Sequence, residues 1–177
     1  RMSVCTKLPQ SIIGPKRRII VIGDLHADFK ITQKLFMNLN LINDNKKWIA
    51  KPLDTIVVQV GDVLDGGSRG TNVEAHGELD ILDFFEHVHE QADLYGGGVY
   101  SIIGNHEIMN VLGNFSYASQ HDIKNDGGEE SRRDKYTNGS LLANKMSCTR
   151  NVIMKVGSFV FVHAGVLPKH IRNDNKN

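Results

Sequence analysis

The stretch RIIVIGDLH, residues 18–26, decides the fold, because a short apolar run ends in glycine and passes directly into charged and imidazole side chains. The same arrangement returns in TIVVQVGD, residues 55–62, and in GVYSIIGNHE, residues 98–107. Runs rich in β-branched residues and bounded by turn residues are typical of buried parallel strands. We therefore predict three such strands, at residues 18–23, 55–61 and 98–104.

The segments between these strands carry a helical pattern. Apolar residues recur there every three or four positions, as in Phe29, Leu35 and Leu39 and, between Glu74 and Ala92, in Leu82, Phe85 and Val88. This spacing places the apolar side chains on one face of an α-helix. Strand, helix, strand, helix, strand predicts an α/β fold with a doubly wound sheet built from βαβαβ units. Ligands bind such sheets at the carboxyl ends of the strands.

A different pattern fills the last third of the chain. NVIMKVGSFVFVHAG, residues 151–165, is apolar on both sides of a turn at Gly157, which predicts a β-hairpin that leads into His163. Residues 113–140 are rich in glycine, asparagine, serine and charge, so we predict a polar surface insertion with at most a short helix near residues 139–146. We assign residues 18–168 to one domain, 1–17 to an N-terminal extension and 169–177 to a polar tail.

Composition excludes several classes of protein. The chain has 177 residues, 40% of them hydrophobic, and 21 basic against 20 acidic residues give a net charge of +1, so we expect neither nucleic acid nor an anionic membrane as a partner. No apolar run approaches the roughly 20 residues that cross a bilayer, and no signal peptide is visible, so we expect a cytoplasmic protein. Cys5 and Cys148 lie far apart without CxxC spacing, and we expect both to be reduced.

Chemically active side chains follow each predicted strand directly. Asp24 and His26 follow the first strand, and Asp62 and Asp65 the second; Asn105 and His106 follow the third strand, and His163 follows the hairpin. Carboxylates, imidazoles and an amide oxygen that meet at one edge of a sheet form a ligand set that suits a pair of divalent transition ions.

The four motifs GDLH, GDVLD, GNHE and HAG, in this order and each after a strand, resemble those of the calcineurin-like metallophosphoesterases. Within them the chain resembles the phosphoprotein phosphatases, and the passage from GNHEIMNVLGNFSYAS to VIMKVGSFVFVHAGVLP is most similar to the bacterial-type, Shewanella-like branch. The resemblance covers residues 18–168. It implies a β-sandwich flanked by helices, with the active site at the carboxyl ends of the strands.

The resemblance also implies a metal site. Asp24 and His26 would hold a first divalent ion, Asp62 would bridge two ions, and Asn105 and His163 would hold the second. The ligand chemistry suits Mn²⁺ and an iron–zinc pair equally. Asp28, next to the first motif, is predicted to cap the following helix rather than to bind metal.

The reaction that the resemblance implies is hydrolysis of a phosphomonoester, as in a serine/threonine protein phosphatase. A hydroxide between the metals would attack phosphorus in line, and His106, held by Asp65, would protonate the leaving group. Asn105 would also contact the substrate phosphate. The substrate would be a phosphorylated protein or a small phosphoester.

Some positions depart from the family pattern. Gly66 stands where the family has a phosphate-binding arginine; Arg69 either replaces that arginine or is a solvated surface residue. A further histidine ligand is expected beyond residue 177, with His121 as a substitute within the chain. A diadenosine-polyphosphate hydrolase, a phosphodiesterase and an inactive phospho-recognition module therefore stay open as alternatives.

Two charged groups receive structural predictions. Glu107 is expected to cap or orient the helix that it opens rather than to bind metal. Arg132 and Arg133, with Glu129 and Glu130 beside them, are expected to form a solvated charged loop, with an arginine near the phosphate site as the alternative.

Overall fold

Two small sheets form the centre of the molecule. A computed structural model describes residues 5, 9–66 and 77–170. The first sheet has the order β2-β3-β4, all parallel, and consists of β2 (Ile19–Ile22), β3 (Ile56–Gln59) and β4 (Gly98–Ser101). In the second sheet β5 pairs parallel with β1 and antiparallel with β6; its strands are β1 (Ile12–Ile13), β5 (Ile153–Val156) and β6 (Phe159–Val162). The three predicted strands and the hairpin are confirmed.

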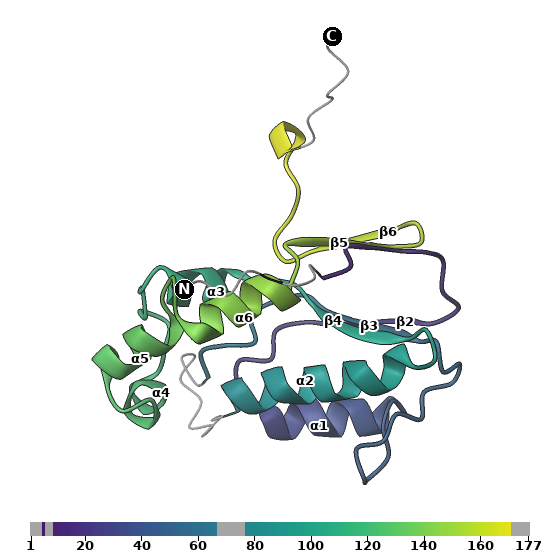
Figure 1. Cartoon of the computed structure of the whole chain (residues 1–177), viewed down its shortest axis with the longest axis horizontal. Coiled ribbons are helices and arrows are strands. Elements are labelled where there is room, and N and C mark those ends of the chain that lie inside the picture. Colours follow the sequence, from purple (N-terminus) through teal and green to yellow (C-terminus); the bar gives the residue numbers. More distant parts are fainter. Residues whose placement is uncertain (1–4, 6–8, 67–76, 171–177) are drawn as a thin grey trace.

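Two helices cover only one face of the first sheet. Figure 1 shows α1 (Phe29–Asn38) and α2 (Glu78–Asp93) side by side on that face, with β5 and β6 on the other. The predicted sandwich is therefore confirmed, but the doubly wound sheet is wrong. The strands lie in the sheet in the same order as in the sequence. Right-handed crossovers between strands in this order leave both connecting helices on the same face of the sheet. The opposite face is left for the second sheet.

Strand β3 divides the core into two parts. Val57 belongs to the cluster between sheet and helices, together with Phe36 and Phe85. Ile56 and Val58 face the other way, in a cluster that includes Met154 and Val156 of the second sheet. Every residue of β3 is buried, as expected for a central strand that is covered on both faces. The carboxyl end of this strand is thereby fixed from both sides.

The segment after β4 is largely helical. A helix is present near residues 139–146 as predicted, but the prediction of at most that one short helix is wrong. It contains α3 (Asn105–Val111), α4 (Gln120–Asn125), α5 (Glu129–Tyr136) and α6 (Leu141–Thr149), and the described chain ends in a short 3₁₀ turn, Pro168–His170. Ser119 and Ser140 cap α4 and α6 by accepting hydrogen bonds from the backbone three residues on, each at 3.0 Å. Serine caps are the sequence feature that predicts such helices. Each of these helices is too short for a helical spacing of apolar residues to be recognised in the sequence.

Two further findings concern the whole chain. Cys5 and Cys148 form a disulfide, with their Cα atoms 5.4 Å apart, so the prediction of two reduced thiols is wrong. Sequence spacing could not reveal this pair, because 143 positions separate the two residues. Within the described residues no helix has the length and apolar character needed to cross a membrane.

Candidate active site

Strained turns present the polar side chains at the edge of the first sheet. Four residues other than glycine have positive φ there: His26 at 43°, Ala27 at 59°, Asp62 at 57° and Asp65 at 63°. L-residues adopt this conformation at a cost, and such residues cluster at functional sites where the surrounding structure holds them. The turns after β2 and β3 are therefore fixed by contacts around them rather than by local preference.

Glu107 supplies many of those contacts. Its buried carboxylate accepts hydrogen bonds from the backbone N–H groups of Asp62 (3.0 Å), Val63 (2.8 Å) and Leu64 (3.2 Å). It also accepts one from Gly104 N–H, at 2.7 Å. The predicted orienting role of Glu107 is confirmed and extended, because this side chain fastens the turn after β3 to the start of α3.

Gly104 is required beside Asp62. A Cβ atom at position 104 would collide with the Asp62 carboxylate and lie 2.5 Å from the Asp62 backbone nitrogen. The backbone before Asn105 can therefore approach Asp62 only because residue 104 has no side chain. This close approach brings the second and third motifs into one site.

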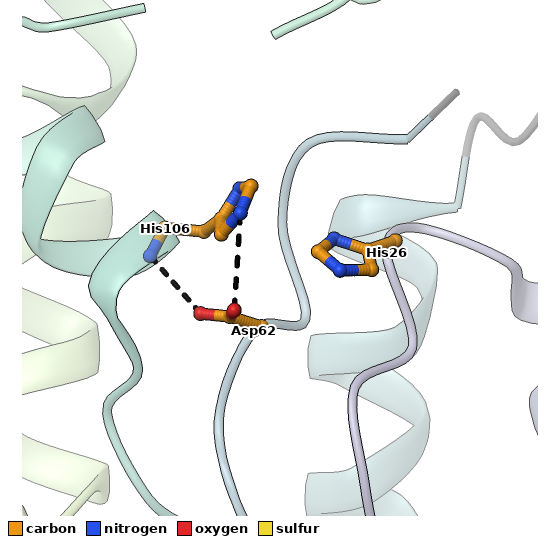
Figure 2. Close-up of side chains that lie close together, drawn as sticks. All are labelled: His26, Asp62 and His106. Carbon is orange, nitrogen blue, oxygen red and sulfur yellow. Dashed lines mark hydrogen bonds and ion pairs between the residues drawn. The ribbon is translucent and has the colours of Figure 1, made fainter. Parts of the chain in front are cut away.

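Asp62 lies at the centre of the site. Its carboxylate belongs to two groups of possible metal ligands. One group consists of Asp62, Asp24 and His163, and the other of Asp62, His26 and His106. In each group the ligand atoms lie no more than 4.8 Å from one another. Asp62 Oδ2 is 3.3 Å from His163 Nε2 and 3.8 Å from His106 Nε2. Figure 2 shows that His26 and His106 come from separate segments toward Asp62. One carboxylate is thus shared by both groups.

The histidine contacts test whether metal ions fit here. His26 Nδ1 lies 3.2 Å from the Leu64 carbonyl and His163 Nδ1 lies 2.7 Å from the Val60 carbonyl, so both rings carry their proton on Nδ1. Nε2 is then the ring nitrogen that remains available as a ligand in each histidine. His26 Nε2 is buried without a hydrogen-bond partner, and His163 Nε2 faces the Asn105 Oδ1 atom at 2.9 Å. Histidines held through Nδ1, with Nε2 directed into a group of carboxylate and amide oxygens, fit divalent metal ions.

His106 and Asp65 form a buried dyad. His106 Nδ1 donates to Asp65 Oδ2 at 2.8 Å, and the His106 backbone N–H donates to Asp62 Oδ1 at 3.0 Å. The hydrogen bond that His106 donates to Asp65 raises the pKa of His106. Burial lowers this pKa, and the charge of Asp62 raises it further. The ring is only 3% exposed and turns Nε2 toward Asp62. Asp65 thus sets the tautomer and the direction of an imidazole at the site.

A model of the calcineurin-like phosphoesterase family matches residues 17–176, which include every one of these motifs. The chain belongs to this family. Three of the motifs in this range contribute Asp24, Asp62 and His163, which form one group of possible metal ligands.

Named relatives point to phosphatases. The chain is 38% identical over 107 residues to Shewanella-like protein phosphatase 2 of Arabidopsis thaliana, covering 60% of this chain and 25% of the relative. It is 29% identical over 153 residues to Shewanella-like protein phosphatase 1 of Plasmodium berghei, covering 84% and 39%. The structure of a cold-active protein-tyrosine phosphatase of a psychrophilic Shewanella species superposes with a TM-score of 0.76 at 19% identity, covering 92% of this chain and 46% of that one. The chain spans less than half the length of these relatives.

The site also includes an arginine that the sequence favoured as part of a solvated loop. Arg132 of α5 is fully buried, and its Nη2 atom lies 2.7 Å from Asp65 Oδ1. The expectation that Arg132 is solvated is wrong, whereas its neighbour Arg133 is exposed beside Glu129 as predicted. Tyr136, four residues after Arg132 and also buried, is the one sequence sign of a buried face on α5.

Other predicted residues lie elsewhere. Arg69 falls outside the described residues, and Gly66 is buried after the dyad residue Asp65. His121 lies exposed on α4, and its Nδ1 contacts the Asn125 side-chain amide at 2.8 Å. Among the described residues, the groups of possible metal ligands do not include His121. Asp28 caps α1 as predicted, by accepting from Ile31 N–H at 2.9 Å.

Proposed function

We propose that this chain carries the active site of a binuclear metal-dependent phosphomonoesterase of the serine/threonine protein phosphatase type. The observation that carries the proposal is the position of Asp62, whose carboxylate is shared between two groups of ligand atoms. Two cations roughly 3.5 to 4 Å apart need a negative charge between them, and a buried aspartate supplies it. The phosphatase names of the relatives support the same reaction class.

Five side chains would hold the metal ions. Asp24, His26, Asp62, Asn105 and His163 all present oxygen or nitrogen atoms at the shared sheet edge. Two divalent cations, when bound there, would neutralise charge on the phosphate and lower the pKa of a water molecule so that it becomes a nucleophile. Mn²⁺ and an iron–zinc pair both suit this ligand set.

The dyad would complete the reaction. His106 Nε2 faces the metal-binding side, while Nδ1–H stays bonded to Asp65. In this orientation His106 can give its Nε2 proton to the departing alcohol oxygen. Asn105, next in the chain, and Arg69 would contact the substrate phosphate.

The substrate is proposed from chemistry and from the names of relatives. A phosphoprotein is favoured by the two Shewanella-like protein phosphatases, and the Shewanella structure adds phosphotyrosine as a residue to test. Gly66, in the place of a phosphate-binding arginine, favours the alternative of a module that binds phosphorylated partners without turnover. Diadenosine polyphosphates and phosphodiesters test the remaining alternatives.

The experiment measures phosphate release after metal-free protein is loaded with Mn²⁺, Fe²⁺, Zn²⁺ or Ni²⁺. Substrates are phosphoserine, phosphothreonine and phosphotyrosine peptides, diadenosine tetraphosphate and a bis-aryl phosphate. Asp62→Asn should abolish turnover, because it removes the charge shared by both metal positions. Asp44→Asn, in an exposed turn, is the matched control and should retain turnover.

The possible outcomes distinguish the phosphatase from the alternative functions. Metal-dependent release from phosphopeptides that is lost in Asp62→Asn supports the phosphatase, whereas faster release from one of the other substrates moves the proposal to that substrate. Absence of turnover with all four metals overturns the enzyme, and tight phosphopeptide binding without turnover would establish the recognition module instead.

A further inference from the structure

Helix α5 places an arginine behind the dyad. Arg132 is 0% exposed although it lies in a segment whose other charged residues are mostly at the surface. Burial of a guanidinium ion is costly unless hydrogen bonds and opposite charges replace the water. Its contacts therefore decide what this residue does.

All five N–H groups of Arg132 are used. Nε donates to Asn110 Oδ1 at 3.0 Å, and Nη2 donates to Asp65 Oδ1 at 2.7 Å and to Glu78 Oε1 at 3.0 Å. Nη1 donates to Glu78 Oε2 at 3.2 Å and to Asp126 Oδ2 at 2.5 Å. The guanidinium also lies 4.4 Å from the centre of the Tyr136 ring. The guanidinium group is planar and has five N–H donors, so it can bind all of these partners at once.

Asp65 is held from every side by this arrangement. Its Oδ1 atom accepts from Arg132 and Asn110, and Oδ2 accepts from Asn110 at 2.9 Å and from His106 Nδ1 at 2.8 Å. Its backbone N–H donates to Glu78 Oε1 at 2.8 Å. The carboxylate consequently cannot rotate away from His106 without breaking bonds to both Arg132 and Asn110.

We infer that Arg132 is a positioning residue for protonation of the leaving group: it holds the Asp65 carboxylate in place, so that Asp65 keeps His106 aimed at the substrate. The inference rests on the proposed phosphatase activity. In the reaction, a hydroxide oxygen forms a bond to phosphorus and the bond from phosphorus to the leaving oxygen breaks. The electron pair of the broken bond takes the Nε2 proton of His106, while Nδ1–H stays bonded to Asp65.

Charge explains why an arginine is needed. Asp65 and Glu78 both contact Arg132, and Asp126 is shared between Arg132 and Lys135. Without Arg132, Glu78 would have no cationic partner among the described residues, and Asp65 would keep only the His106 ring as an ion-pair partner there. Asp65 Oδ1 would also lose the hydrogen bond from Arg132 Nη2. Asp65 would then be held less firmly as the acceptor for His106 Nδ1–H.

A purely structural role would look different in kinetics. Arg132 also joins α5 to α2 through Glu78, so its loss could disturb the whole site and slow every substrate alike. Loss of leaving-group protonation, in contrast, slows poor leaving groups far more than good ones, because a stable anion departs without a proton. The dependence on leaving group therefore separates the two roles.

The experiment compares Arg132→Met with Arg133→Met in the metal-loaded chain. Turnover is measured with phenyl phosphate, a poor leaving group, and with 4-nitrophenyl phosphate, a good one. Arg132→Met should lower kcat roughly 100-fold on phenyl phosphate and less than about tenfold on 4-nitrophenyl phosphate, with KM little changed. Arg133→Met should leave both rates within about twofold of the unmodified chain, because Arg133 is exposed and its ion pair with Glu129 contributes little.

A double-mutant cycle tests the route through Asp65. If Arg132 acts on His106 only through that carboxylate, Arg132→Met should slow the Asp65→Asn variant by less than about twofold on phenyl phosphate. Additive losses from the two substitutions overturn the inference.

Arg132→Lys guards against a variant that does not fold. Lysine keeps the charge but cannot bind Asp65, Glu78 and Asn110 together, so an intermediate leaving-group dependence is expected. Equal slowing of both substrates in the folded variants, or no slowing, overturns the inference while the phosphatase proposal stands. Absence of metal-dependent turnover in the unmodified chain identifies failure of the phosphatase proposal itself.

Discussion

At the scale of single residues, the site contains a buried ring nitrogen that has no hydrogen-bond partner. His26 has one ring nitrogen directed at the Leu64 carbonyl and the other buried without a hydrogen bond. Its position 26 also has positive φ. A histidine that is strained, oriented through one nitrogen and unsatisfied at the other is arranged as a metal ligand is arranged.

Substitution of this histidine tests the metal site directly. His26→Ala should lower the affinity for one metal ion by at least roughly 100-fold, since even second-shell losses reach that size. After dialysis, elemental analysis of His26→Ala should find about one metal ion per chain fewer than in the unmodified chain. His87→Ala, at an exposed position of α2, serves as the control and should keep the metal content of the unmodified chain. Unchanged metal content in His26→Ala would remove His26 from the ligand set.

A second unsatisfied residue lies outside the proposed catalytic groups. Arg150 is buried, its Nη1 atom has no hydrogen-bond partner, and burial lowers the pKa of its guanidinium. Arg150→Met removes this buried charge at similar volume and should raise the free energy of unfolding by about 1 to 2 kcal/mol. Urea denaturation measures the change.

The matched arginine for this comparison is Arg18, which donates to the Leu39 carbonyl at 2.7 Å. Arg18→Met should lower the free energy of unfolding by about 1 kcal/mol, because a satisfied hydrogen bond is lost. Destabilisation of the same size in both variants would show that Arg150 has favourable partners after all.

At the scale of elements, the site depends on how α3 and the turn after β3 are joined. Glu107, in the first turn of α3, accepts four backbone hydrogen bonds, three of them from residues 62–64. The turn contains Asp62 at positive φ and could not persist alone. The motif GNHE therefore supplies both the proposed catalytic residues and the support that holds Asp62.

Glu107→Gln tests this support without changing the size of the side chain. The amide would direct its own N–H group at backbone donors, so the free energy of unfolding should fall by about 2 to 4 kcal/mol. Metal affinity should weaken with it, as measured by titration with Mn²⁺. Glu90→Gln, exposed on α2, is the control and should match the unmodified chain in both measurements. Normal stability in Glu107→Gln would mean that other contacts hold the turn.

At the scale of the whole molecule, two sheets and a disulfide combine distant segments. The second sheet joins β1 near the N-terminus to the β5–β6 hairpin and brings His163 to Asp62. The Cys5–Cys148 bond links the same region to the end of α6. The disulfide also closes a long loop, because 143 positions separate its cysteines, and this restricts the unfolded chain.

Replacement of both cysteines by serine should lower the free energy of unfolding by about 2 to 4 kcal/mol. The measurement is denaturant unfolding of the two forms without reductant. With reductant added, the unmodified chain should approach the stability of the double variant. A double variant as stable as the unmodified chain without reductant would contradict this expectation.

The sequence by itself determined the three strands, the hairpin and the residues that gather at the site. These follow from local features, because a β-branched run, a glycine and a polar residue after it fix a strand end and what projects from it. Asp24 and His163 were predicted as ligands of two different ions that share Asp62, whereas in the structure these three residues form one group of possible ligands.

Only the tertiary structure decided that the sheet is covered by helices on one face, that Cys5 reaches Cys148, and that Arg132 stands behind Asp65. The physical reason is that burial and pairing depend on partners remote in sequence. Arg132 and Arg133 are identical neighbours in the sequence, yet one is buried among carboxylates and the other lies in water. That difference arises from the packing of α5 against Asp65 and Glu78, which no local pattern contains.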